Sequence, residues 1–230
     1  MKFLCLPGAY CTAKTFQAQL KPICDCLASN GATSFVFTQG TVPVTPSAEF
    51  EGFFGPQPHY AFLKPDDVSS IKSNMRNFPK LDTPEETLRL ALKVAGQPTF
   101  SDIVPLYGPP CPYIRHGFAR TRRDMEAKGT RASPSHPIAI FIEGWPPVDP
   151  TTHRVVLAGE VGEVIKIPTC HVVGAEDPYI DGSMTLYNVC DPDQAEIFDH
   201  GGHILPRGKQ TVQELVDTVR EMIRSAEQAS

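Results

Sequence analysis

Two stretches near the C-terminus decide the fold class of this sequence, Val172-Val173-Gly174-Ala175-Glu176-Asp177-Pro178-Tyr179 and Phe198-Asp199-His200-Gly201-Gly202-His203-Ile204-Leu205-Pro206. Each begins as an apolar run and ends in a polar loop, and the loops present Asp177 and His203. An acid followed by a histidine, each on a loop after a late strand, is the order of the last two members of a Ser…Asp…His triad. The sequence therefore predicts an orienting carboxylate and a general base that meet at one edge of a sheet.

The rest of the chain alternates short runs of β-branched and aromatic residues with segments of helical periodicity. This alternation indicates βαβ units and a mostly parallel sheet covered on both sides. Strands are predicted at Phe3–Leu6, Ser34–Thr38, Ile138–Ile142, Thr169–Val173 and Ala195–Phe198. Helices are predicted at Ala13–Ser29, Thr83–Lys93, Gly117–Lys128, Gly182–Val189 and Lys209–Ala226. The fold class is therefore α/β and doubly wound, in a single domain over residues 1–230.

The composition suits a protein without nucleic-acid or membrane partners. The chain has 230 residues, 41% of them hydrophobic, and a formal net charge of -5, whereas nucleic acids and anionic membranes attract clustered Lys and Arg. No apolar run approaches the ~20 residues of a membrane span, and the opening residues are too few for a signal peptide, so we expect a cytoplasmic protein. Seven scattered cysteines without metal-ligand spacing are typical of reduced, mostly buried thiols, and neither metal nor cofactor is predicted.

Residues 40–79 differ from the rest because prolines alternate with aromatic rings. Proline removes backbone donors from a sheet, so we expect an ordered excursion rather than a sheet strand. One interpretation is a surface loop that is clamped by its own aromatic rings. The other is a lid-like insertion that forms a wall of an acyl pocket.

Five motifs, in this order along the chain, carry a resemblance to a known family: Phe3-Leu4-Cys5-Leu6-Pro7-Gly8-Ala9-Tyr10, Gly52-Phe53-Phe54-Gly55-Pro56, Phe141-Ile142-Glu143-Gly144-Trp145-Pro146-Pro147, Gly174-Ala175-Glu176-Asp177-Pro178-Tyr179 and Gly202-His203-Ile204-Leu205-Pro206. Together they resemble the fungal FSH-type serine hydrolases of the α/β-hydrolase superfamily. Many members are esterases or thioesterases of secondary-metabolite gene clusters. The resemblance implies an α/β-hydrolase-like fold and a small acyl substrate.

The resemblance also implies roles for individual residues. His203 matches the general base, and Asp177 matches the carboxylate that orients its imidazole. A plain turn acid and an exposed loop histidine are the alternative interpretations. After the first strand, the backbone N–H groups of Ala9 and Tyr10 match the family's oxyanion turn, although Pro7 stands where the family has a histidine.

The chain departs from the family between residues 101 and 117. It contains no Gly-x-Ser-x-Gly nucleophile elbow, and prolines occupy positions 105, 109, 110 and 112. Because each proline deletes a ladder N–H, we expect the central strand and the nucleophile to be absent and the sheet to have a truncated centre. Such a sheet would expose apolar edges, so a homodimer that pairs through the gap is also expected.

Three other side chains are candidates for the nucleophile. Cys111 lies near the missing elbow, where His203 would activate its thiolate, but it sits between prolines. Ser133 and Ser135 precede a strand, whereas an elbow needs a strand, a sharp turn and then a helix, so they are better interpreted as loop serines. The nucleophile therefore stays unassigned.

The functional prediction is hydrolysis of an acyl ester or thioester in secondary-metabolite biosynthesis. The alternative is a catalytically silent hydrolase-fold protein that binds a small apolar ligand or a protein partner. The missing elbow leaves three explanations open: a shortened version of a functional hydrolase, a pseudo-enzyme, and an enzyme with a different nucleophile.

Overall fold

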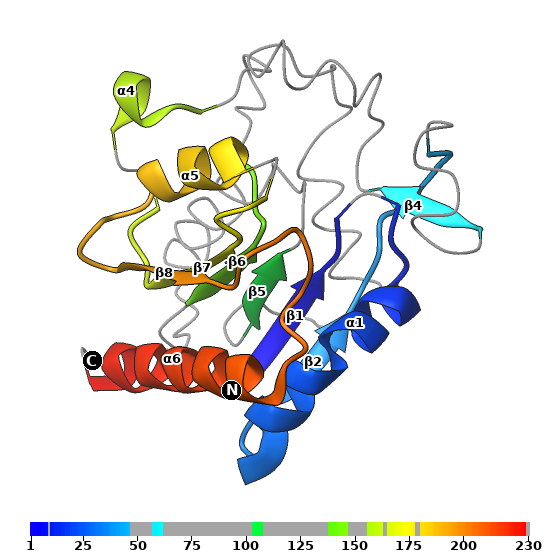
Figure 1. Cartoon of the computed structure of the whole chain (residues 1–230), viewed down its shortest axis with the longest axis horizontal. Coiled ribbons are helices and arrows are strands. Elements are labelled where there is room, and N and C mark those ends of the chain that lie inside the picture. The colour runs from blue at the N-terminus through cyan, green and yellow to red at the C-terminus, as the bar shows by residue number, and fades with distance from the viewer. Residues whose placement is uncertain are drawn as a thin grey trace, which may run out of the picture.

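The computed structural model describes residues 1–8, 10–46, 57–61, 103–107, 138–146, 156–162, 165–177 and 180–228. Within them, six parallel strands form the main sheet in the order β2-β1-β5-β6-β7-β8 (Figure 1). The strands are β1 (Lys2–Leu6), β2 (Ser34–Phe37), β5 (Ile103–Tyr107), β6 (Ala139–Ile142), β7 (Thr169–Val173) and β8 (Ala195–Asp199). Because all six strands are parallel, their carboxyl ends lie at the same edge of the sheet. Open α/β sheets bind their ligands at this edge.

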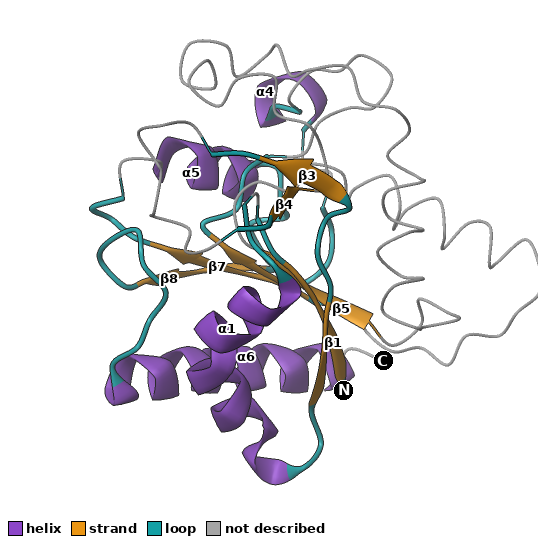
Figure 2. Cartoon of the chain, turned by 90° about the vertical axis from the view of Figure 1, so that its right-hand side faces the viewer, coloured by secondary structure: helices purple, strands orange, loops and turns teal. Residues whose placement is uncertain are grey.

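Helices cover both faces of this sheet (Figure 2). One face carries α1 (Ala13–Leu27), which the short 3₁₀ turn η1 (Ala28–Asn30) extends, and α6 (Lys209–Gln228). The other carries α5 (Ile180–Asn188), and α4 (Ala158–Val161) lies on the same side. The fold class predicted from the alternating pattern, α/β with a mostly parallel sheet, is therefore confirmed.

Alternation along the strands builds the two halves of the core. In β1, Phe3 and Cys5 pack toward α1 and α6, whereas Leu4 and Leu6 pack toward α5. All four are buried, as expected for a strand covered on both faces. The apolar stripe of α6, which the sequence predicted as core, is buried against the first of these faces at Val212, Leu215, Val216, Val219 and Met222.

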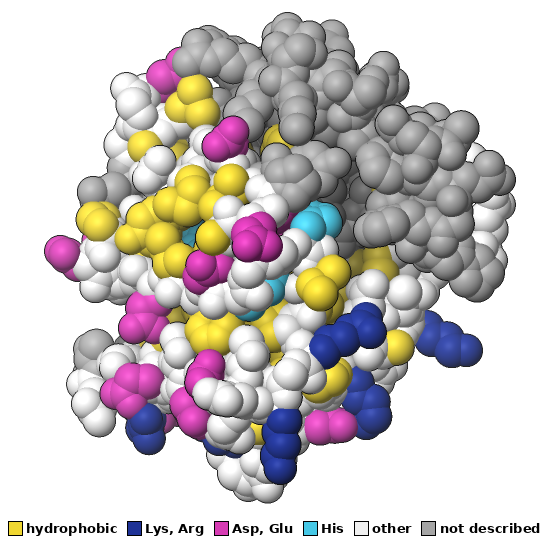
Figure 3. Space-filling model, viewed as in Figure 1, with side chains coloured by type: hydrophobic (Ala, Val, Ile, Leu, Met, Phe, Trp, Pro, Cys, Tyr) yellow, Lys and Arg dark blue, Asp and Glu magenta, His cyan; other side chains and the backbone are white. Residues whose placement is uncertain are grey.

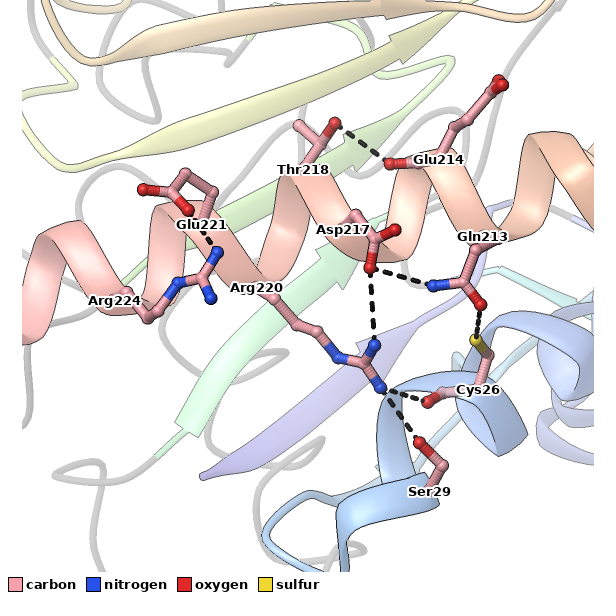
Figure 4. Close-up of polar contacts among 9 residues, drawn as sticks. All are labelled: Cys26, Ser29, Gln213, Glu214, Asp217, Thr218, Arg220, Glu221 and Arg224. Atoms are coloured by element: carbon pink, nitrogen blue, oxygen red, sulfur yellow. Dashed lines mark hydrogen bonds and ion pairs between the residues drawn. The ribbon is translucent and has the colours of Figure 1, made fainter.

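Polar contacts join α1 to α6 (Figure 4). The guanidinium of Arg220 donates to the carbonyl of Cys26 at 2.7 Å and to the hydroxyl of Ser29 at 3.0 Å. Cys26 Sγ lies 3.4 Å from the side-chain oxygen of Gln213. These contacts join the last turn of α1 and the 3₁₀ turn after it to α6.

The expectation of an absent central strand was wrong. β5 lies between β1 and β6, with Leu4 opposite Pro105 and Ile140 opposite Leu106. Backbone N–H groups of a parallel strand point alternately to the two neighbours, so Pro105 removes a single ladder bond. The prolines at positions 109, 110 and 112 come after the strand ends. The sheet is not truncated at its centre, and a homodimer that pairs through a gap loses its premise.

The expectation of no strand in residues 40–79 was also wrong for the part that is described. β3 (Val42–Val44) and β4 (His59–Ala61) form a separate antiparallel pair in which Pro43 lies opposite Tyr60. A strand with only one neighbour accommodates proline, because positions that face away from the partner need no ladder bond. The lid interpretation otherwise falls outside the described residues.

The remaining predicted elements agree with the structure to within a few residues. The strand Thr169–Val173 has the predicted bounds, and the other four predicted strands and three of the helices differ only at their ends. The helices predicted at Thr83–Lys93 and Gly117–Lys128 lie outside the described residues. In the described part of the chain, no helix combines the length and hydrophobicity that a membrane crossing requires.

Candidate active site

The loops after β7 and β8 approach each other closely at Gly174. A Cβ atom at this position would lie 2.5 Å from the carbonyl oxygen of Gly202 and 2.6 Å from that of Gly201. Only glycine allows two backbones to pass at this distance. The contact is held by a backbone hydrogen bond from Glu176 to Gly201 at 2.7 Å. The two segments that decided the fold class therefore lie against each other in space.

Asp199, at the end of β8, ties both loops together. One oxygen of its carboxylate accepts hydrogen bonds from the backbone N–H groups of Ala175 and Gly201, each at 3.0 Å. These bonds lower the pKa of Asp199, because they stabilise its charged form. The carboxylate therefore holds the start of one loop against the start of the other.

Asp177 and His203 meet at this junction. His203 Nδ1 lies 2.9 Å from Asp177 Oδ2, and the Asp177 side chain is 1% exposed while the imidazole is 31% exposed. An ionised carboxylate only accepts, so Nδ1 carries the proton and, in the neutral imidazole, Nε2 keeps its lone pair. Figure 3 shows histidine side chains that reach the surface with acidic side chains beside them. The arrangement suits a general base with an orienting acid.

Glu143 is a second acid at the same imidazole, and sequence reasoning assigned it no role. It follows β6 directly, its side chain is 9% exposed, and its Oε2 lies 3.2 Å from His203 Nδ1. The sequence does carry a signal for it: Glu143 directly follows an apolar strand, and Asp177 lies on the loop after the next apolar strand of the sheet. Because β6 pairs with β7 in parallel, their carboxyl ends meet at one edge.

The electrostatics of Glu143 differ from those of an exposed acid. Burial raises its pKa from 4.5 to about 7, His203 acts to lower the pKa, and Asp177 adds to the rise. Its side-chain oxygen Oε1 is buried, and no described residue forms a hydrogen bond with it. The site therefore contains a carboxyl group that changes its charge near neutral pH.

Glu143, Asp177 and His203 also have the composition of a metal site. Each offers one ligand atom, and these atoms all lie within 4.8 Å of one another. A cation bound there would take the Nδ1 atom that contacts Asp177, and it would end the hydrogen bond that orients the imidazole. We therefore interpret the three residues as an acid–base site.

The predicted oxyanion turn lies after β1. Tyr10 has a φ of +65°, which is uncommon outside glycine, and its carbonyl accepts a hydrogen bond of 3.1 Å from Nδ1 of the buried His59 in β4. Through this hydrogen bond, β4 holds the turn that follows β1. Ala9, the other predicted donor, lies outside the described residues.

The candidate nucleophiles Cys111, Ser133 and Ser135 lie outside the described residues. Among the described thiols, burial raises the pKa of Cys11 to about 11 and the pKa values of Cys24, Cys170 and Cys190 to about 12. Such thiols are neutral at physiological pH and react slowly. β5 ends at Tyr107, and the chain continues Gly108-Pro109-Pro110-Cys111.

Comparison with known proteins finds similarity to hydrolases. The family model described as "Serine hydrolase (FSH1)" matches residues 116–215, a range that includes Glu143, Asp177 and His203. The resemblance to the FSH-type serine hydrolases is confirmed. "Esterase FPY3" of Fusarium mangiferae is 24% identical over 99% of this chain and 95% of its own length. "Hydrolase phiM" of Talaromyces stipitatus is 24% identical over 94% of this chain and 85% of its own length.

Structural comparison identifies the fold. The crystal structure of Zea mays acyl-protein thioesterase 2 matches 96% of this chain and 93% of its own, with a TM-score of 0.55 and 11% sequence identity. The fold is that of the α/β-hydrolases, in which the nucleophile elbow follows a strand of the central sheet. In this chain β5 is a central strand, between the strand of the predicted oxyanion turn and β6.

Proposed function

We propose that this protein hydrolyses small acyl esters or thioesters. The observation that carries the proposal is the 2.9 Å contact between His203 Nδ1 and the buried Asp177 carboxylate, on loops from adjacent parallel strands. The relatives named as an esterase and a hydrolase support the same reaction class. The acyl substrate is proposed to come from secondary metabolism, as in many FSH-type hydrolases.

In the proposed mechanism, Asp177 holds the imidazole of His203 in one tautomer. Nε2 removes a proton from the attacking nucleophile and later returns it to the leaving alcohol or thiol. Asp177 stabilises the imidazolium that forms between these steps without taking its proton. The N–H groups of Ala9 and Tyr10 are proposed to bind the oxyanion.

Two nucleophiles are compatible with this role of His203. One is a side chain in the segment after β5, where Cys111 is the first thiol or aliphatic hydroxyl in the sequence. The other is a water molecule that attacks the acyl carbon directly and forms no covalent intermediate. If Cys111 is the nucleophile, the substrate protects it from iodoacetamide and the variant Cys111→Ala loses its activity. If water attacks directly, Cys111→Ala keeps its activity.

The reaction is tested with p-nitrophenyl butyrate and a butyryl thioester, on the wild type and on His203→Ala and Asp177→Asn. We expect kcat/KM to fall by about 10² to 10⁴-fold in His203→Ala, the usual contribution of a general base. His171→Gln is a matched control, since His171 is a buried histidine of β7 that contacts Thr169 at 3.1 Å. Hydrolysis that survives His203→Ala unchanged contradicts the proposal.

The absence of a Gly-x-Ser-x-Gly motif favours a second candidate, a hydrolase-fold protein that binds a small apolar ligand or a protein partner without turnover. It predicts that the wild type hydrolyses neither substrate and that an acyl-chain analogue raises its Tm. Residence in the cytoplasm and assembly as a homodimer, by a surface other than a gap in the sheet, are further proposals. Cell fractionation and sedimentation velocity test them.

A further inference from the structure

We propose that Glu143 is a second positioning acid for His203, so that carboxylates from two different loops hold the imidazole. Asp177 comes from the loop after β7 and Glu143 from the end of β6. The catalytic consequence rests on the proposed function. The positioning itself is a property of the folded protein and is measured without a substrate.

The distances place a second carboxylate beside the same proton. His203 Nδ1 donates a hydrogen bond of 2.9 Å to Asp177 Oδ2, and Glu143 Oε2 makes an ion-pair contact of 3.2 Å with the same nitrogen. If the Asp177 carboxylate is removed, Glu143 is near enough to accept this N–H.

The backbone directs Glu143 to this position. Its φ is +49°, a left-handed conformation that residues other than glycine adopt at a cost of about 1 kcal/mol or more. A backbone hydrogen bond of 2.9 Å from Glu143 to the carbonyl of Val172 fixes the peptide to β7. A strained residue that is held by its neighbours at the edge of a sheet indicates a function rather than a packing role.

The carboxyl group is also an unfavourable choice for stability alone. The residue is 7% exposed, and its Oε1 has no hydrogen-bond partner among the residues that the structure describes. An apolar or amide side chain would avoid the desolvation of an acid. The observation is accounted for if the second oxygen, Oε2, is retained to contact His203.

The charge of Glu143 depends on the groups that face it from the neighbouring elements. These are Asp177 after β7 and His203 after β8, while His200 interacts electrostatically with both of these residues. Because burial raises the pKa of Glu143 to about 7, it is neutral in mildly acidic solution and charged in mildly basic solution. As a carboxylate, it adds negative charge beside the imidazole and stabilises the imidazolium.

Proton NMR of the ring Nδ1–H of His203 tests the positioning directly. The signal is assigned by its loss in His203→Gln and followed from pH 6 to 8 in the wild type, Asp177→Ala, Glu143→Gln and the double variant Asp177→Ala/Glu143→Ala. Alanine leaves no side-chain acceptor, so we expect the hydrogen-bonded signal to persist in Asp177→Ala at pH 8 and to vanish in the double variant. Its loss in Asp177→Ala alone, or its survival in the double variant, overturns the proposal.

The single variant Glu143→Gln keeps the test decisive if Asp177→Ala does not fold. We expect its signal to shift upfield from the wild-type position at pH 8, because an amide oxygen is a weaker acceptor than a carboxylate. The exposed change Glu214→Gln on α6 is the matched control and should leave the signal unchanged. A Glu143→Gln spectrum identical to the wild type at every pH overturns the proposal.

Kinetics adds a second readout and separates the two proposals. For an active wild type, we expect kcat/KM of Asp177→Ala at pH 8 to fall by about 10 to 10²-fold. That of Asp177→Ala/Glu143→Ala should fall by about 10³ to 10⁴-fold, the loss expected when no acid orients the base. An inactive wild type with the expected NMR result contradicts the proposed function alone. An active wild type whose double variant matches Asp177→Ala contradicts the role of Glu143 alone.

Discussion

Glu143 determines the character of the site at the scale of single residues. A dyad of Asp177 and His203 needs only one acid, yet the structure presents two carboxyl groups to one ring nitrogen. Both acids are buried, and burial raises the pKa of Glu143, whose Oε1 has no partner among the described residues. A buried acid with a raised pKa beside a histidine is characteristic of functional sites.

The stability of the protein should record the burial of Glu143. Burial raises the pKa of Glu143 from 4.5 to about 7 in the folded protein, so the unfolded chain releases this proton at a lower pH than the folded protein does. The free energy of unfolding of the wild type is therefore highest, as far as Glu143 is concerned, below about pH 4.5, and this contribution is lost as the pH rises through about 7. Glu143→Gln removes this titration. We therefore expect its free energy of unfolding, relative to wild type, to increase from pH 5 to pH 8 by about 1 to 3 kcal/mol. Urea unfolding at both pH values measures the difference.

Glu214→Gln, an exposed change on α6, serves as the control for that comparison. Its free energy of unfolding relative to wild type should stay constant between pH 5 and pH 8. A constant difference for Glu143→Gln as well would contradict the interpretation of Glu143 as a buried acid that ionises near neutral pH.

At the scale of elements, the site depends on how closely the loops after β7 and β8 approach. Gly174→Ala would place a Cβ 2.5 Å from the backbone oxygen of Gly202, so the loops must separate. We expect a loss of about 1 to 3 kcal/mol of stability from this overpacking. We also expect about a 10²-fold loss of kcat/KM, because a shift of about 1 Å misplaces His203 against Asp177. Thermal unfolding and ester hydrolysis measure the two effects.

Gly159→Ala on α4 is the matched control, since nothing lies within 4 Å of the Cβ it would add. It should leave both the Tm and the activity close to wild type. If Gly174→Ala behaves like Gly159→Ala, the close approach of the loops does not position the dyad.

At the scale of the whole molecule, the sheet and the helices on both faces are proposed to unfold as one domain over residues 1–230. Buried thiols report on both faces. Cys170 packs toward α1 and α6, Cys190 packs toward α5, and burial raises both pKa values to about 12. We expect iodoacetamide to label both cysteines at the same urea concentration, together with the loss of helical signal. Mass spectrometry of pulse-labelled peptides measures this.

The partly buried Cys11 is the control and should be labelled at lower urea concentrations. Labelling of Cys190 well before Cys170 would show that the α5 face opens separately and would contradict a single cooperative domain.

Several features follow from local sequence alone. The alternation of apolar runs predicted β7 and β8. The spacing of Val212, Leu215 and Val216 predicted the buried face of α6. The order of an acid and a histidine after two strands predicted that Asp177 and His203 approach each other. These features succeed because each depends on periodicity or on the parallel direction of neighbouring strands.

The central strand β5 and the contact of Glu143 with His203 were decided only by the tertiary structure. The prolines predicted that the central strand is absent, but Pro105 removes only one ladder bond, and β5 is held by pairing with β1 on one side and β6 on the other. Similarly, Glu143 gains its meaning from the pairing of β6 with β7, which brings a side chain 60 residues before His203 to the same ring nitrogen. Neither fact is local, because both are set by which strands lie side by side.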